Sequence, residues 1–309
     1  MSRVEGGAVH RGHGCRTRAA ALGTLLAGFV LAGNVLAYDA RSHQLLTFLA
    51  AKQLSRCLAA DDGPHLSPLQ VRGIANGTAA LADTNFAVRM LRWAYYDPLE
   101  RQGVSVAWLV STRFNDHFRA QVAELETAEQ ESDRLALLGR IAGYVQLVSS
   151  PARALPVYTA RFWRWSVADR FDGYPIREAE LEDLLDDDCS HLDSVPDSYE
   201  RILAEVAADT LEAVRSPLGP LPATWEAFWT PPQEPGAFGS YGPAGNNFGR
   251  YTEFPCSVPE LYRCVLITDD PAYTAFARDR QLAAVRGTAR AMRLFLRGGG
   301  GQAPSGAAR

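Results

Sequence analysis

The stretch that decides the fold is GRIAGYVQLVSSPARALPVY, Gly139–Tyr158. Its apolar residues recur at helical spacing, and Pro151 falls where a helix of this length would end. The stretch therefore predicts a buried helix followed by a turn. Its rhythm is also typical of a metal-binding helix, but it contains no His, Cys, Asp or Glu.

Most of the chain around this stretch has the same helical periodicity. In SHQLLTFLAAKQLSRCL, leucines line one side and Ser42 is the expected N-cap. Two further helix starts have the capping-box form, SPLQ at residues 67–70 and DSYE at residues 197–200. Strand-like alternation is scarce. The predicted fold class is therefore all-α, with one multi-helix domain over residues 38–297.

Two segments depart from the helical pattern. Residues 216–255 are dense in Pro and Gly with Trp225, Trp229 and Phe238 interleaved, which predicts a long irregular excursion packed by its aromatic rings. Residues 298–309 are rich in Gly and small residues and are expected to form a flexible tail.

The first 37 residues have the form of a signal peptide. Arg11, Arg16 and Arg18 precede an uncharged apolar run that ends in VLA, which predicts cleavage after Ala37. A secreted or periplasmic protein follows, with no transmembrane segment after cleavage. Removal of residues 1–37 takes away four Arg and one Glu, so the net charge moves from −4 to about −7. That charge argues against nucleic acid as a partner and leaves an unidentified envelope or extracellular ligand.

Four cysteines remain in the mature chain and allow three disulfide pairings. Cys256 and Cys264 are close in CSVPELYRC, which favours a local bridge between them and a long bridge from Cys57 to Cys189.

The mature N-terminus carries the first sign of a family. Cleavage would place Tyr38 first and His43 five residues later, which resembles the start of the zinc-dependent phospholipases C and the single-strand-specific nucleases. In that family the first residue binds zinc through its amine and carbonyl groups. Two later stretches of the chain resemble the family's next motifs. LAD has Asp83 at a ligand position, and WAYYD has Ala94 where the family has a His.

The opening stretch resembles the family's His-Tyr-x-x-Asp-x-x-x-Pro-x-His motif, in which His and Asp share one helix face. Tyr144 and Pro151 are in register, but Gly143, Leu147 and Arg153 stand at the three ligand positions. Further on, Asp169 and Asp172 fit an acidic pattern seen in related bacterial proteins. The resemblance runs from Tyr38 to Tyr174 and implies a helical scaffold that has lost most of its metal ligands.

A histidine count agrees with that loss, because the family uses about five His for three zinc ions. The mature chain has four histidines, His43, His65, His117 and His191. The resemblance therefore implies no cofactor, or at most one residual zinc held by Tyr38, His43 and Asp83. The favoured interpretation is a non-catalytic binding or structural protein in which Arg153 pairs with Asp83. The alternative is a surviving metal-dependent hydrolase of phosphate esters.

Overall fold

The computed structural model describes residues 38–59, 64–82, 95–98, 114–155, 157, 169–186, 188–233, 239–256 and 262–299. Contacts divide the chain into Met1–Val35 and Leu36–Arg309, and every described residue belongs to the second unit. The predicted signal peptide therefore lies outside the described residues. Among those described, no helix is both long and apolar enough to cross a membrane.

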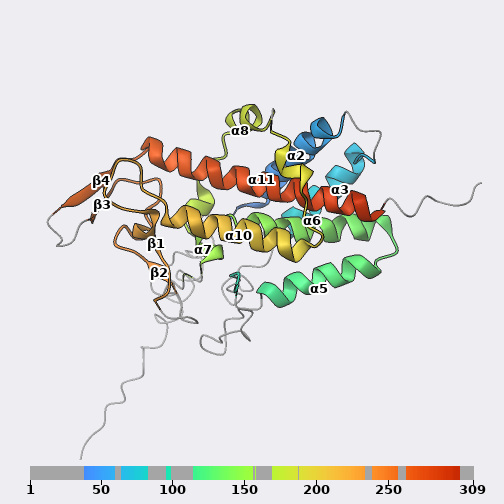
Figure 1. Cartoon of the computed structure of the whole chain (residues 1–309), viewed down its shortest axis with the longest axis horizontal. Helices are drawn as coiled ribbons and strands as arrows, with labels where there is room; N and C mark the ends of the chain where they lie inside the picture. Colours follow the sequence, from blue (N-terminus) through green and yellow to red (C-terminus); the bar gives the residue numbers. More distant parts are fainter. Residues whose placement is uncertain are drawn as a thin grey trace, which may run out of the picture. The chain divides into compact units, whose positions relative to one another are not determined.

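Helices dominate this unit (Figure 1). The α-helices are α2 (Ala40–Cys57), α3 (Pro68–Ala82), α5 (Phe114–Thr127), α6 (Glu131–Leu147), α7 (Pro151–Ala154), α8 (Glu178–Leu185), α9 (Ser190–Asp193), α10 (Tyr199–Arg215) and α11 (Pro271–Gly299). Two 3₁₀ turns are η3 (Phe171–Gly173) and η4 (Trp225–Ala227). The strands are β1 (Trp229–Thr230), β2 (Ser240–Tyr241), β3 (Thr252–Pro255) and β4 (Arg263–Leu266).

The opening stretch of the sequence forms α6 and α7, and α6 packs against α3, α5 and α11. The crossing of α6 with α3 depends on two glycines. A Cβ atom on Gly77 would lie 2.4 Å from the carbonyl oxygen of Ala136, and one on Gly139 would lie 2.2 Å from that of Ile74. Because both obstacles are backbone atoms, only glycine allows the helices to approach this closely. The predicted buried helix is confirmed, and Pro151 begins α7 instead of extending α6.

The caps show how far local sequence determines the helix starts. The capping box at the start of α3 is confirmed, since Ser67 N–H donates to Gln70 Oε1 (2.8 Å) and Gln70 N–H donates to Ser67 Oγ (3.3 Å). The prediction for α2 is wrong, because Asp39 is the cap and accepts the N–H of Ser42 at 2.7 Å. At α10 the cap is Ser198, one residue later than the predicted box.

The all-α class predicted from the sequence is wrong, because the described chain also contains two small antiparallel sheets of two strands each. β1 pairs with β2, and β3 pairs with β4 in a register that sets Phe254 opposite Cys264. The strands are only two to four residues long, which is too short for alternation to register as a pattern. The structure is thus mixed and mostly helical.

Both favoured disulfides are confirmed. Cys57 at the end of α2 is bonded to Cys189 before α9, with a Cα–Cα distance of 5.6 Å. Cys256 and Cys264 close the β3–β4 hairpin, with a Cα–Cα distance of 5.7 Å.

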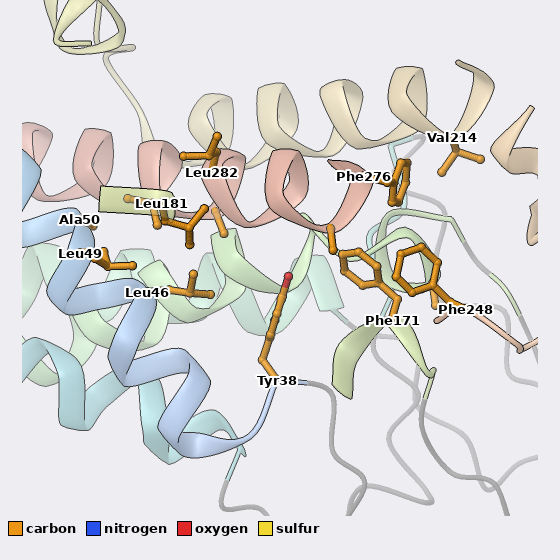
Figure 2. Packing of buried hydrophobic residues seen from close by; sticks show 14 of the residues in the cluster. Tyr38, Leu46, Leu49, Ala50, Phe171, Leu181, Val214, Phe248, Phe276 and Leu282 are labelled. Atoms are coloured by element: carbon orange, nitrogen blue, oxygen red, sulfur yellow. The ribbon is translucent and has the colours of Figure 1, made fainter. Parts of the chain in front are cut away.

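The excursion at residues 216–255 packs through its aromatic rings, but it is not wholly irregular, because it contains η4, β1, β2 and β3. Trp225 and Trp229 are buried against Phe276 of α11, at centroid distances of 4.3 and 5.7 Å. Phe171 and Phe248 belong to the same cluster, and Figure 2 shows their two rings close together near Tyr38. Phe238, the third aromatic residue named for this excursion, lies outside the described residues.

Candidate functional site

Two of the residues that the resemblance implicates in metal binding lie together. Tyr38 precedes α2, and His43 is in the first turn of that helix. Their ring centroids are 5.8 Å apart, and each residue is only 1% exposed. Figure 2 shows the Tyr38 ring directed into the packed interior toward α11. The pair therefore lies at the centre of the helical core and not on a surface.

The His43 ring belongs to a hydrogen-bonded network across α2, α6 and α11. Its Nδ1 lies 2.5 Å from Oε1 of Gln146. The amide nitrogen of Gln146 donates to the hydroxyls of Thr47 (3.0 Å) and Thr288 (3.2 Å). Both amide hydrogens are thus used on threonines, so Oε1 faces the imidazole and Nδ1–H must be the donor. All four side chains are buried, and we refer to them as the amide network.

Burial controls the charge of this histidine. It lowers the pKa of His43 from 6.5 to about 4, because the imidazolium form would lose its hydration. The bond to Gln146 and the charge of Asp39 oppose that shift, and the guanidinium of Arg153 adds to it. His43 is therefore neutral at physiological pH, with its tautomer set by Gln146.

Tyr38 precedes the residues of this network in the sequence, and its ring contacts the ring of His43. Burial raises the pKa of its phenol well above the usual range. The nearby Ser149 hydroxyl and the charge of Arg280 oppose the shift, and the charge of Asp172 adds to it, while the Tyr38 hydroxyl itself has no hydrogen-bond partner among the described residues. The phenol is consequently neutral and acts as a packed polar group.

The three degenerate ligand positions on α6 and α7 do not converge on one point. Gly143 faces α3, where an added Cβ would lie 2.4 Å from Cδ1 of Leu81. Leu147 is half-buried against an apolar cluster from α5, α6 and α10. Arg153 is half-buried on α7, and its carbonyl oxygen accepts the N–H of Tyr96 at 2.9 Å. Of the three, only Arg153 interacts electrostatically with His43.

The other two positions cannot be placed, because Asp83 and Ala94 lie outside the described residues. Within the described ranges, no group of three or more His, Cys, Asp or Glu side chains could hold a metal ion. In His43, Nδ1 carries the proton donated to Gln146, so Nε2 is the nitrogen that could bind a metal. The described residues by themselves therefore do not make a zinc site.

The two aspartates of the acidic pattern are both buried and both hydrogen-bonded. Asp169 accepts three bonds, from the N–H of Phe171 (2.8 Å), Nε1–H of Trp229 (2.8 Å) and the hydroxyl of Tyr241 (2.7 Å). We refer to these four residues as the carboxyl network. It ties η3 to the aromatic excursion.

Asp172 binds the second serine of the opening stretch, since Ser150 Oγ donates to its Oδ1 at 2.5 Å. The neighbouring Ser149 donates to the carbonyl oxygen of Gln146 at 2.8 Å. Both serines are fully buried, so neither hydroxyl is presented to an external substrate.

Sequence reasoning missed Gln146, which connects the three helices. A signal was present, since Gln146 is the only amide side chain in the apolar run from Ile141 to Val148. A lone amide on a buried helix face needs partners, but the sequence could not show that they lie on α2 and α11.

Comparison with family models, with curated proteins and with solved structures finds no match to this chain.

Proposed function

We propose that this protein is a secreted or periplasmic, non-catalytic helical protein with a binding or structural role, derived from the zinc-dependent phospholipase C and nuclease scaffold. The observation that carries the proposal is that His43 is fully buried and that, among the described residues, no group of three or more His, Cys, Asp or Glu forms a metal-binding cluster around it. An enzyme that used His43 as a zinc ligand would need other ligands converging on it. On the described part of α6, its neighbours are instead an amide and apolar side chains.

The packing around α6 supports the same proposal. Restoring histidine at Gly143 would force its side chain into Leu81, and restoring aspartate at Leu147 would put a carboxylate into an apolar cluster. Arg153 supplies a permanent positive charge near His43, which disfavours a cation there. In the proposed protein, Arg153 pairs with Asp83 in place of a metal.

The cellular location belongs to the proposal as well. Two disulfides in one chain are typical of proteins that fold in an oxidising compartment. This agrees with the signal peptide expected at residues 1–37 and with cleavage after Ala37. The proposed ligand or partner is therefore one of the cell envelope or the extracellular medium.

A second candidate is a residual metal-dependent phosphodiesterase, and one observation favours it. Donation of Nδ1–H to an oxygen is the usual arrangement of a histidine that binds metal through its other nitrogen. In that case zinc would be held by the Tyr38 terminus, His43 and Asp83, and would supply an activated water.

Metal analysis of the protein secreted with its natural N-terminus distinguishes the two candidates. The proposal predicts less than about 0.1 zinc per chain after exposure to zinc and gel filtration, and no hydrolysis of nitrophenyl phosphorylcholine above background. Asp83→Ala should behave like the wild type, as should the control Asp116→Ala on α5. Retention of about one zinc per chain that Asp83→Ala abolishes and Asp116→Ala preserves would replace the first candidate with the second.

A further inference from the structure

The β3–β4 hairpin, with the residues that flank its strands, carries four of the seven exposed large apolar side chains of the described chain, Tyr251, Tyr262, Val265 and Ile267. Tyr251 is 60% exposed, Val265 42% and Ile267 58%, and all three lie beside one another on its outer face. The inner face carries Phe254 and Leu266, which are buried in the core. Figure 1 shows the hairpin beyond the N-terminal end of α11.

The ladder also leaves backbone groups without partners along β4. Cys256 N–H donates to the carbonyl oxygen of Tyr262, so the hydrogen-bonded pairs of this antiparallel ladder are the even-numbered ones. The N–H and C=O groups of Arg263 and Val265 consequently point away from β3. Within the described part of the chain, no hydrogen bond is found for these groups. The outer edge of β4 is therefore open to another strand.

The outer edge of β3 is less suited to pairing. Pro255 lies on it and has no N–H to donate. Pairing of two copies there, centred on Glu253, would also set the two Glu253 carboxylates directly opposite each other. The hairpin thus offers one edge for pairing and blocks the other.

The geometry points to a second copy of this chain as the strand that pairs with β4, antiparallel and centred on Val265. In that register each Val265 faces its own symmetry mate, and Arg263 faces Ile267 of the other copy. The side chain of each Arg263 keeps its ion pair with Glu253 of its own hairpin. The two Glu253 carboxylates then lie about 14 Å apart, three strand spacings, and the two Arg263 residues lie four residues apart along neighbouring strands, also about 14 Å, so like charges repel each other little.

The interface is self-complementary, as a two-fold dimer requires. Each outward N–H of Val265 meets the C=O of Val265 from the other copy, and the apolar row of Val265 and Ile267 continues across both hairpins. The interface is also small, so the dimer is a reversible one that forms with rising concentration.

The test is sedimentation equilibrium on the full secreted chain from about 5 to about 500 µM, a range suited to a small interface. The wild type should dimerise. V265K should raise the dimer Kd at least about tenfold, because it sets two ammonium groups opposite each other across the axis. In the monomer the new lysine faces Glu253, so the hairpin itself is preserved. The matched control L69K makes the same change on α3 at another exposed residue and should dimerise like the wild type.

Hydrogen exchange gives a second readout of the same edge. The Val265 amide should exchange quickly at low concentration and become protected at high concentration, in the wild type and L69K but not in V265K. A monomer at all concentrations with a fast-exchanging Val265 amide would overturn the inference. So would a V265K protein that dimerises as tightly as the wild type, or an L69K protein that loses the dimer.

Discussion

The amide network around His43 is fully buried and the carboxyl network around Asp169 is buried except at Tyr241, and the two hold different parts of the molecule together. The first joins α2, α6 and α11 through one neutral amide and two threonines. The second joins η3 to the aromatic excursion through one carboxyl group with three donors. Both contain a residue that the expected family resemblance singles out from the sequence, His43 in the first and Asp169 in the second. In both, the polar atoms are used to connect elements far apart in the chain.

The two disulfides differ in the length of chain they close. Cys57 and Cys189 are separated by 132 residues, and Cys256 and Cys264 by 8. Loop-closure entropy then predicts that C57S/C189S lowers the free energy of unfolding by about 5 kcal/mol, and C256S/C264S by about 2.5 kcal/mol. Urea unfolding monitored by tryptophan fluorescence measures both. Equal losses for the two variants would contradict the entropic ranking.

The carboxyl network can be broken at its acceptor. Asp169→Ala leaves the donors of Phe171, Trp229 and Tyr241 without their shared partner, which should lower the free energy of unfolding by about 4 kcal/mol. Tyr241→Phe removes a single bond at a half-buried position and should cost about 1 kcal/mol. If both variants lost the same amount, Asp169 would not be the centre of the network.

The amide network should make stability depend on pH. The pKa of His43 is about 4 in the folded protein and 6.5 in the unfolded chain, so the unfolded state binds more protons between these values. The contribution of His43 to the free energy of unfolding should therefore be constant above pH 6.5, fall by about 3 kcal/mol as the pH drops to 4, and change no further below that.

The control for this prediction must separate His43 from a second histidine with a lowered pKa. His191 also has a pKa lowered to about 4 by burial, although it is half-exposed. His43→Asn should remove most of the change in the free energy of unfolding between pH 6.5 and pH 4. His191→Asn should remove a smaller part of it. A slope that survives His43→Asn unchanged would show that His43 is not buried and neutral.

A smaller effect than the pH-dependent loss is expected from the centre of the amide network itself. Gln146→Leu keeps the volume but leaves Nδ1–H of His43 without its acceptor, which should cost about 2 kcal/mol in urea unfolding. The threonine hydroxyls lose less, because Thr47 still donates to the carbonyl oxygen of His43. Gln121→Leu, on the half-buried side of α5, is the matched control and should cost less than 1 kcal/mol, about the value of an exposed bond. A Gln146→Leu protein as stable as the wild type would mean that the network contributes nothing.

Local signals in the sequence predicted the helices well. The capping box at Ser67, the buried helix before Pro151 and both disulfides are seen in the structure. The strands were missed because β1 and β2 have two residues each, and the sheets they form depend on a turn of the chain and not on alternation.

The site was only partly predictable. The spacing of Tyr38 and His43 brought them into one cluster, because both lie at the start of a single helix. The partner of His43 lies 103 residues away on α6, and nothing local in the sequence relates the two. The role of Gln146 therefore follows only from the packing of α2 against α6 and α11.

The central claim is that the His43 ring is committed to an internal bond, and ¹⁵N NMR of the imidazole tests it most directly. The account predicts a neutral ring at pH 7 with the proton on Nδ1, and a spectrum that one equivalent of zinc does not change. Gln146→Leu should shift the Nδ1 resonance, because it removes the acceptor. A wild-type spectrum in which zinc moves the Nε2 resonance would contradict the account, because His43 would then be a metal ligand.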